Sequence, residues 1–373
     1  MSNNCTWSRD HMTSLLRDYQ SDAFFMSSPH RGMLAQQPVY NLTSADTALA
    51  VLAASSSSVL VGAFPFDRSR PARLGLSDLA RYAAPTPFAV PWPPSLRRVR
   101  WSRRTEDVVG YRRAVARVLD RMAHGDLYRV VLGRTIELIA DQAVSPGDLL
   151  AGVLAGGAAP RHAYAVDLGG RTLLGSGPAL LVAQHNGVVF ANPLTGWAPR
   201  DPDPVRDDEN ATALLRSAFC RREHRMAVDA AADRLAPLCR GLSVSPEPDL
   251  LRTGTMWHLS SRITAASRGG GTALDVALAL HSDSPVVGGP SWQASEPLAE
   301  LESFDREFFS GMVGWTDSRG NGEWMVTSQC AEMRGELLRL FAASDVLPGS
   351  TPDSEVAATD IKFHTILRAL QAA

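Results

Sequence analysis

The order of apolar and polar positions predicts blocks of strand and helix along most of the chain. Continuous or alternating apolar runs predict strands within 55–67, 127–139, 161–177, 187–196, 255–266 and 323–333. Spacings of three and four residues predict an amphipathic helix within 97–126 and further helices over 223–239, 272–281 and 354–373. Strands and helices do not alternate strictly. The pattern therefore favours an α+β fold with large antiparallel sheets.

Individual residues support two of these predicted helices. In the first, Val115, Val118, Leu119 and Met122 repeat at helical spacing, and Gly125 ends the pattern. In the last, a stripe that can face a core is formed by Ile361, Ile366, Leu367 and Leu370.

Two segments are expected to be irregular. The proline-rich stretch 83–95 predicts an extended connector, because proline fits neither a helix interior nor a central strand. The polar stretch 198–210 predicts a loop before the helix over 223–239. No internal repeat is found, and we expect a single domain over 1–373, with an N-terminal portion up to about 105 and a catalytic core over about 106–373.

Composition narrows the class of protein. The chain has 373 residues, of which 45% are hydrophobic and 20% charged, and its formal charge is -2. This balance gives no electrostatic reason to expect nucleic acid or an anionic membrane as a partner. The chain shows neither a membrane-spanning apolar run nor a signal peptide at "MSNNCTWSRD", so a cytoplasmic protein with a small-molecule substrate is expected. The four cysteines lack metal-like spacing and are expected to be reduced thiols.

Two features bear on chemistry. Only one lysine, Lys362, occurs among 37 basic residues. Arginine does not lose its proton near neutral pH, so a lysine general base could only be this residue. The tight turn "GSGP" at 175–178 lies between two apolar runs and is followed by Ala179, whose methyl group can do no chemistry.

Ten stretches, in order, resemble the chorismate-utilising enzymes, most closely the isochorismate synthases of siderophore and menaquinone pathways. Among them are "YRVVLGR", "NPLTGWAPR", "MWHLSSRI" and "FDREFFSGMVGWTDSRGNGEW". All ten lie at 26–35, 61–67, 128–134, 175–181, 192–200, 223–229, 256–263, 304–324, 329–342 and 359–363. Phe309, where salicylate-forming relatives tend to carry tyrosine, favours the isochorismate synthase branch.

The resemblance implies a fold and a mechanism. It implies two stacked, mostly antiparallel sheets wrapped by helices, a monomer, and a pocket at one end that binds a dicarboxylate with Mg²⁺. A lysine base would activate water, a glutamic acid would protonate the departing hydroxyl, and two glutamates would hold the metal.

Several of these positions are substituted here. The resemblance places the lysine base at Arg129, the general acid at Ala179 and the second metal glutamate at Ala358. The first metal glutamate is kept as Glu223, but the acidic residue expected three positions before it is Cys220. One carboxylate holds a divalent cation weakly, so we expect no cofactor, or at most weakly bound Mg²⁺ at Glu223.

Substrate recognition is altered as well. Gln329 replaces an arginine that would clamp a substrate carboxylate, and Trp197 replaces a small residue. A glycine-rich backbone site reads Ala343, Ser344 and Asp345 instead. The loop after His281 keeps that histidine but places Asp283 where the family has threonine. A neutral or partly cationic, more apolar ligand that stacks on Trp197 is expected.

Three functions remain open at this point. The first is an orthodox Mg²⁺-dependent isochorismate synthase, and the second is a non-catalytic relative that acts as a binding partner. The third, which we favour, is an isomerase- or lyase-type enzyme repurposed in secondary metabolism, with a degenerate active site and a cyclase, dehydratase or pericyclase reaction. It is favoured because the framework stretches are intact while the substitutions concentrate at chemical positions.

For this third function, two sets of residues are predicted. Glu223, His281 and Asp283 are the catalytic candidates. The substrate-binding candidates are Lys362, Trp197, Gln329, Arg129, Asp345 and Phe309. Structural roles are the alternatives: a core position for His281, a turn cap for Asp345, filling of vacated space for Trp197, and an ion pair with Glu223 or Asp360 for Lys362. His224 is a further candidate for chemistry, with a role as a helix-surface or structural residue as the favoured alternative.

Overall fold

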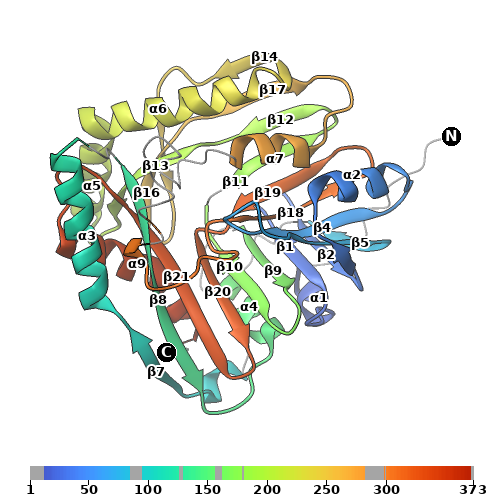
Figure 1. Cartoon of the computed structure of the whole chain (residues 1–373), viewed down its shortest axis with the longest axis horizontal. Helices are drawn as coiled ribbons and strands as arrows, with labels where there is room; N and C mark the ends of the chain where they lie inside the picture. Colours follow the sequence, from blue (N-terminus) through green and yellow to red (C-terminus); the bar gives the residue numbers. More distant parts are fainter. Residues whose placement is uncertain are drawn as a thin grey trace.

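The computed structural model describes residues 12–84, 95–125, 129–155, 162–178, 180–281, 298 and 300–370. Within these residues the strands form two nine-stranded sheets and a small three-stranded sheet, all with antiparallel pairs (Figure 1). In spatial order, the first sheet contains β6 (Leu79–Ala83), β2 (Gly32–Gln36), β1 (Phe24–Ser27), β9 (Ala163–Asp167), β10 (Thr172–Ser176), β20 (Gln329–Arg334), β21 (Leu337–Val346), β8 (Val130–Ala140) and β7 (Trp101–Glu106).

The second sheet and the small sheet follow the same antiparallel pattern. The second sheet contains β14 (Cys239–Val244), β17 (Ile263–Ser267), β12 (Val188–Ala191), β11 (Leu180–His185), β19 (Gly322–Val326), β18 (Met312–Asp317), β4 (Val59–Phe64), β5 (Arg73–Ser77) and β3 (Val39–Leu42). The small sheet contains β13 (Leu194–Pro199), β16 (Met256–Ser260) and β15 (Asp249–Arg252).

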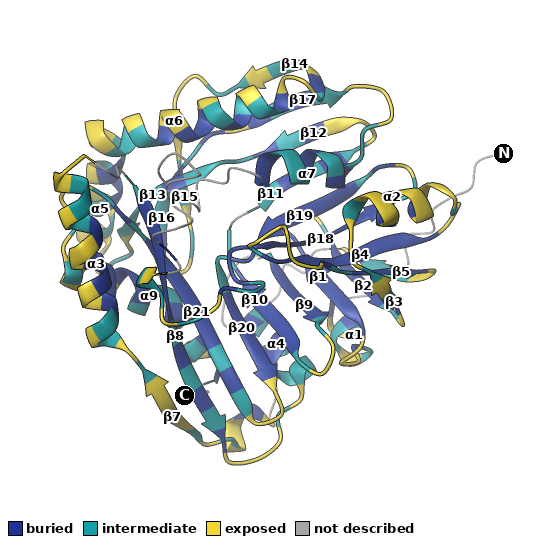
Figure 2. Cartoon of the chain, viewed as in Figure 1, coloured by how far each residue is buried: buried dark blue, intermediate teal, exposed yellow. Residues whose placement is uncertain are grey.

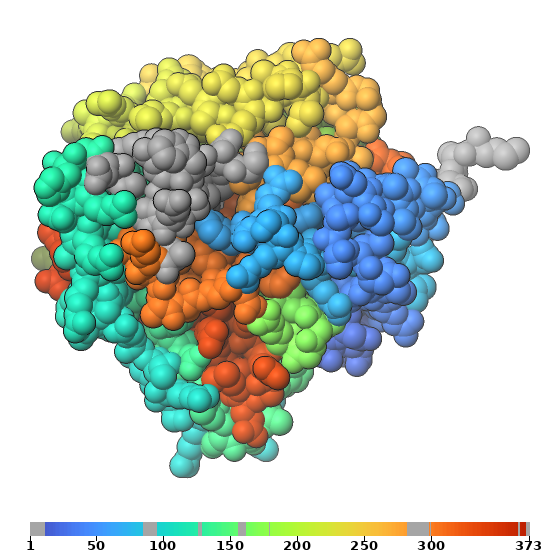
Figure 3. Space-filling model, in the orientation of Figure 1, coloured from blue at the N-terminus to red at the C-terminus, as the bar shows by residue number. Residues whose placement is uncertain are grey.

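Helices cover the sheets. They are α1 (Met12–Arg17), α2 (Ala45–Ala53), α3 (Val108–Ala123), α4 (Pro146–Ala155), α5 (Pro204–Arg216), α6 (Ala218–Leu235), α7 (Ala273–His281) and α9 (Pro352–Leu370), with a 3₁₀ turn η1 at Leu96–Arg98. In the space-filling view, the yellow segment that carries α6 forms one edge of the molecule and the blue N-terminal segment forms another (Figure 3).

The two large sheets pack face to face. Phe24 of β1 and Trp315 of β18 belong to the same apolar cluster between the sheets, whereas Phe25 faces the cluster formed with α4 and α9. Neighbouring strand residues point to opposite faces, so strands covered on both sides read as continuous apolar runs. Figure 2 shows the result: the inner strands of the two large sheets are buried along most of their length, while edge strands such as β7 and β14 and the outer faces of α3, α5 and α6 are exposed.

The predicted α+β fold of two stacked antiparallel sheets is confirmed, and the small third sheet was not predicted. The predicted loop over 198–210 is wrong from Pro204 onward, because α5 begins there. Asp203 caps this helix, its side chain accepting from the backbone N–H of Val205, and Pro204 occupies the first turn. Both are helix-start signals, and the polar composition concealed them.

Two further observations concern the whole chain. The first 106 residues share both large sheets with the rest, through β1, β2, β6 and β7 in one and β3, β4 and β5 in the other. Among the described residues, no helix combines the length and apolarity that crossing a bilayer requires.

Candidate functional site

A cavity of about 180 Å³ opens where the ends of the two large sheets meet the small sheet. The walls come from the first sheet, the second sheet, the β12–β13 segment, and helices α6, α7 and α9. The lining residues are mostly apolar: Val131, Pro178, Leu180, Leu181, Ala191, Pro193, Leu194, Trp197, Ala227, Ala231, Leu280, Val326 and Ala343. The polar groups are few: Arg129, Asn192, Thr195, Arg234, His258, Ser328, Gln329, Asp345 and Lys362. An apolar cavity with a few convergent polar groups is the usual form of a small-molecule site.

An ion pair stands at the point where the first sheet enters the cavity. Arg129 directly precedes β8, and its Nε and one terminal nitrogen donate to the same Asp345 oxygen at 3.0 and 2.6 Å. Asp345 lies on β21 opposite Val131 of β8, so the strand pairing itself brings the two side chains together. The guanidinium is therefore already engaged by a carboxylate of the protein. Asp345 belongs to a strand and does not cap a turn.

Lys362 approaches the same carboxylate from α9. Its Nζ donates to the backbone oxygen of Ala343 at 2.5 Å. Burial lowers the pKa of the Lys362 ammonium, although the Asp345 charge opposes this effect. For Asp345, burial alone would raise the pKa, but the positive charges of Arg129 and Lys362 outweigh it and hold the pKa below its ordinary value. The cavity thus carries an internal carboxylate that is paired with Arg129 and lies within the field of the Lys362 charge.

Trp197 and Gln329 also line the cavity, as do Arg129, Asp345 and Lys362 among the predicted binding residues. Trp197 is half-buried on β13 and presents aromatic surface. Gln329 begins β20 and is half-buried. The structure thus brings together five of the six predicted substrate-binding residues.

Phe309, the sixth, lies elsewhere. Its ring is fully buried between the large sheets and stacks on Phe341, with the ring centroids 5.2 Å apart. It is not part of the cavity wall. In this chain it contributes to packing below the site.

The predicted catalytic residues are divided. Glu223 on α6 lines an adjoining cavity of about 110 Å³ together with Cys220, and this cavity shares Arg129, Trp197 and Asp345 with the first. His281 is buried at the end of α7, where its Nε2 lies 3.2 Å from the backbone oxygen of Ser310, and it does not line the described cavity wall. Asp283 and Ala179 lie outside the described residues.

Of the two roles expected for His224, on the helix surface or in the structure, the buried ring has the structural one. Its two ring nitrogens lie 2.7 Å from the Thr195 hydroxyl and 2.8 Å from the Ser261 hydroxyl. Burial lowers its pKa to about 4, so the ring is neutral near pH 7. Both nitrogens are occupied, which leaves no atom for chemistry.

The residues present do not fit the magnesium that the resemblance implies. The described residues hold no group of three or more histidine, cysteine, aspartate or glutamate side chains able to bind a metal ion. Ala358, at the second metal position, is fully buried on α9 and offers only a methyl group. Asp345 is engaged by Arg129 with the Lys362 charge nearby, and a divalent cation needs several oxygen ligands.

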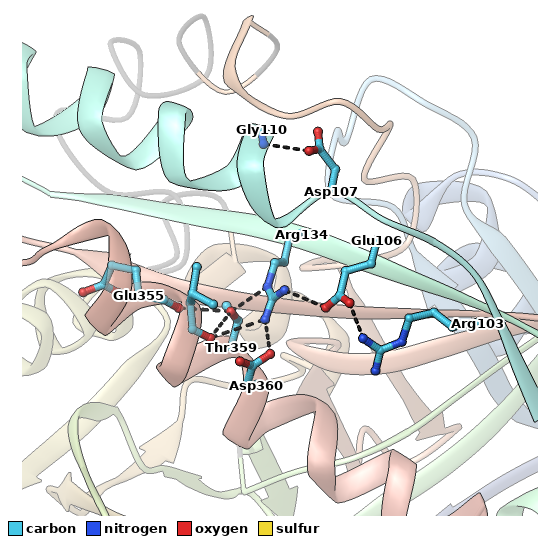
Figure 4. A network of polar contacts seen from close by, with 9 residues as sticks. Arg103, Glu106, Asp107, Gly110, Arg134, Glu355, Thr359 and Asp360 are labelled. Carbon is cyan, nitrogen blue, oxygen red and sulfur yellow. Dashed lines mark hydrogen bonds and ion pairs between the residues drawn. The ribbon is translucent and has the colours of Figure 1, made fainter.

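A buried arginine fixes α9, which carries Ala358 and Lys362, against the first sheet (Figure 4). Arg134 of β8 donates to the Thr359 hydroxyl at 2.8 Å and to Glu106 at 3.0 Å, and it also binds Asp360. Asp360 thus forms its ion pair with Arg134 and not with Lys362. Two of these partners, Thr359 and Asp360, lie on α9, as does the Val356 carbonyl oxygen, which accepts from Arg134 at 3.3 Å. A guanidinium donates in a rigid planar fork, so these contacts orient the helix.

Several polar cavity residues were missed by the sequence reasoning, namely Asn192, Thr195, Arg234, Ser328 and, most relevant for chemistry, His258. His258 lies in the quoted stretch "MWHLSSRI" on β16, and its ring lines the cavity. Its neighbour Trp257 points away and donates its indole N–H to Asp207 at 2.9 Å. Strand alternation could have separated these two roles, but only once the cavity side of the strand was known.

Known proteins match this chain over most of its length. The family model described as chorismate binding enzyme matches residues 92–371. The isochorismate synthase DhbC of Bacillus subtilis (strain 168) is 38% identical over 395 residues, which cover 95% of each chain. The isochorismate synthase EntC of Escherichia coli (strain K12) is 34% identical over 368 residues, covering 92% of this chain and 93% of EntC. The crystal structure of DhbC from Bacillus anthracis superposes with a TM-score of 0.88 at 33% identity, covering 95% of this chain and 98% of the other. The chain belongs to the family of chorismate-binding enzymes.

Proposed function

We propose that this protein is an isochorismate-synthase-like enzyme repurposed in secondary metabolism, which acts without Mg²⁺ on a substrate other than chorismate. The reaction class we assign is a cyclisation, dehydration or pericyclic elimination. The observation that carries the proposal is the Arg129–Asp345 ion pair, which stands where the family resemblance places a lysine base.

The ion pair removes the base of the orthodox reaction. A guanidinium keeps its proton near neutral pH, and here it is also held by two hydrogen bonds to Asp345. The remaining amine, Lys362, comes from α9, which packs against β21, and donates to the Ala343 oxygen. Losing a general base typically lowers a rate by about 10²–10⁴-fold, so an orthodox enzyme with this site would be slow.

The arrangement of charges, more than their sum, bears on a dicarboxylate: among its described lining residues the cavity has three cations, Arg129, Arg234 and Lys362, and one carboxylate, Asp345, which binds Arg129. Asp345 introduces a negative charge next to the space a ligand would fill, and Gln329 supplies no positive charge. A substrate dianion would have to compete with Asp345 for Arg129 and Lys362. A neutral or partly cationic ligand with an apolar body meets the aliphatic walls and the face of Trp197 instead.

Such a site can still accelerate a reaction. Cavity walls can hold a flexible substrate in its reactive conformation without acid–base groups. Such orientation can lower the activation free energy by several kcal/mol. Proton transfer remains available to the polar groups that line the two adjoining cavities, Glu223 among them.

The test uses metabolites of the source cells. An extract of cells that lack the gene is treated with a metal chelator and incubated with the purified protein, and consumed compounds are identified by mass spectrometry. We expect one compound, distinct from chorismate, to be consumed by the wild type and not by the Glu223→Ala variant, whose melting temperature stays unchanged. Consumption of nothing in the chelated extract would contradict the proposal.

A further inference from the structure

His258 is held in one tautomer by the backbone of the small sheet. Its Nδ1 lies 3.1 Å from the carbonyl oxygen of Gly196. A carbonyl oxygen only accepts, so Nδ1 carries the hydrogen and donates it. The other nitrogen, Nε2, is left with a lone pair.

The local backbone is built for this contact. The pairing of β13 with β16 is irregular between Thr195 and Ala198, and Gly196 sits in this bulge with a φ of +58°. Glycine adopts that left-handed conformation at little cost, and bulges beside sites commonly redirect a group. The same bulge places Trp197 in the cavity wall, so the aromatic surface and the carbonyl that orients His258 come from adjacent residues.

Nε2 is available to a ligand. Among the described residues, the His258 ring makes one hydrogen bond, through Nδ1, and Nε2 is not one of the buried polar atoms without a partner. Since His258 lines the cavity, its ring borders the space in which a substrate would lie. His224 makes an instructive contrast, because hydrogen bonds occupy both of its nitrogens.

The charges around His258 keep its ring neutral. Burial lowers its pKa to about 4, and the nearby Lys362 ammonium acts in the same direction. The hydrogen bond to Gly196 and the Asp345 carboxylate oppose these effects. The ring is therefore free of an added proton throughout the neutral range, and its imidazolium form would give a proton back readily.

We propose that Nε2 of His258 is the proton-accepting atom of this cavity, and that the substrate is a neutral, largely apolar molecule with an acidic C–H, N–H or O–H group. The charge and the apolar character of the substrate rest on the proposed function, whereas the role of His258 rests on the hydrogen bond to Gly196. In the reaction, the proton moves to Nε2 and the bonding electrons stay on the substrate. There they shift into a new bond or expel a leaving group. The imidazolium then returns the proton to the rearranged substrate or to the leaving group.

The first arm of the test measures the state of the nitrogen with diethyl pyrocarbonate. A neutral imidazole nitrogen attacks its carbonyl carbon and displaces ethyl carbonate, which is released as CO₂ and ethanol. Peptide mass spectrometry then locates the modified histidines. We expect His258 to be modified at a rate that does not change between about pH 5 and 7. His224, whose two ring nitrogens are both hydrogen-bonded, is expected to remain unmodified. A native protein in which His258 is not modified would overturn the proposal.

The second arm measures turnover of the compound that the wild type consumes. The variant is His258→Gln, because the glutamine amide can still donate to the Gly196 oxygen but cannot accept a proton as a base. We expect kcat to fall by about 10²-fold or more, with little change in KM and melting temperature. His124→Gln is the matched control, since His124 is exposed at the end of α3. Wild-type turnover in His258→Gln would overturn this inference alone, whereas absent turnover in the wild type would overturn the proposed function and the catalytic role together.

Discussion

Separating Arg129 from Asp345 should destabilise the protein unequally, depending on which partner is removed. After Arg129→Met, Asp345 keeps the positive charge of Lys362 nearby. After Asp345→Asn, the positive charges of Arg129 and Lys362 are no longer offset by the carboxylate. Their mutual repulsion then lowers the free energy of unfolding. We therefore expect Asp345→Asn to cost more stability than Arg129→Met.

The magnitude follows from distance and burial. Opposite unit charges about 4 Å apart attract by about 4 kcal/mol at an effective dielectric constant of about 20. The side chains of Arg129 and Asp345 are 15% and 26% exposed. Desolvation of the two charges and partial screening by solvent therefore cancel a large part of this attraction. We expect a net coupling of about 2 kcal/mol, in the range of a hydrogen bond between charged groups.

The assay is a double-mutant cycle in urea. Unfolding of the wild type, the two single variants and the double variant is followed by tryptophan fluorescence and circular dichroism. Coincident transitions are required before free energies are compared. Glu247→Gln serves as the control, because the Arg221–Glu247 pair is exposed and should contribute less than about 1 kcal/mol. A coupling below about 0.5 kcal/mol, or a larger loss from Arg129→Met, would refute the electrostatic account.

Two further predictions concern the metal position and the histidines. Ala358→Glu places a carboxylate at a fully buried position, so we expect a lower melting temperature that Mg²⁺ partly restores, whereas Mg²⁺ leaves the wild type unchanged. A wild-type melting temperature that rises with Mg²⁺ would contradict this. The pKa values of His162, His224 and His258 are lowered by burial to about 4, whereas an unfolded histidine titrates near 6.5. Between these values the unfolded chain binds the extra protons, so stability is complete above about pH 6.5 and falls as the pH drops toward 4. A urea midpoint that stays constant from pH 7 to 5 would speak against buried neutral rings.

Much of the fold could be predicted because the elements have strong local signals. The apolar run within 55–67 became β4 (Val59–Phe64), the helix over 272–281 became α7 (Ala273–His281), and the C-terminal helix became α9 (Pro352–Leu370). The helix expected over 223–239 is shifted, because α6 begins at Ala218, where Ser217 caps it through the N–H of Cys220. Its C-terminal end instead enters β14 at Cys239.

The site was predictable only in part, because side-chain partners depend on which strands are neighbours. Arg129 and Asp345 lie 216 positions apart and meet through the pairing of β8 with β21. The contact of His258 with Gly196 depends on an irregular pairing that apolar periodicity does not reveal. Phe309 was placed at the site by resemblance, whereas its packing on Phe341 follows from two sheets that face each other.

The most direct test of the central claim is a calorimetric titration of the wild-type protein with chorismate, with and without Mg²⁺, followed by analysis of the mixture for isochorismate. Because Asp345 occupies Arg129 and the described residues offer no metal site, we predict no saturable heat and no isochorismate in either titration. Saturable binding that depends on Mg²⁺ and yields isochorismate would contradict the account and would show that this cavity performs the reaction of its named relatives.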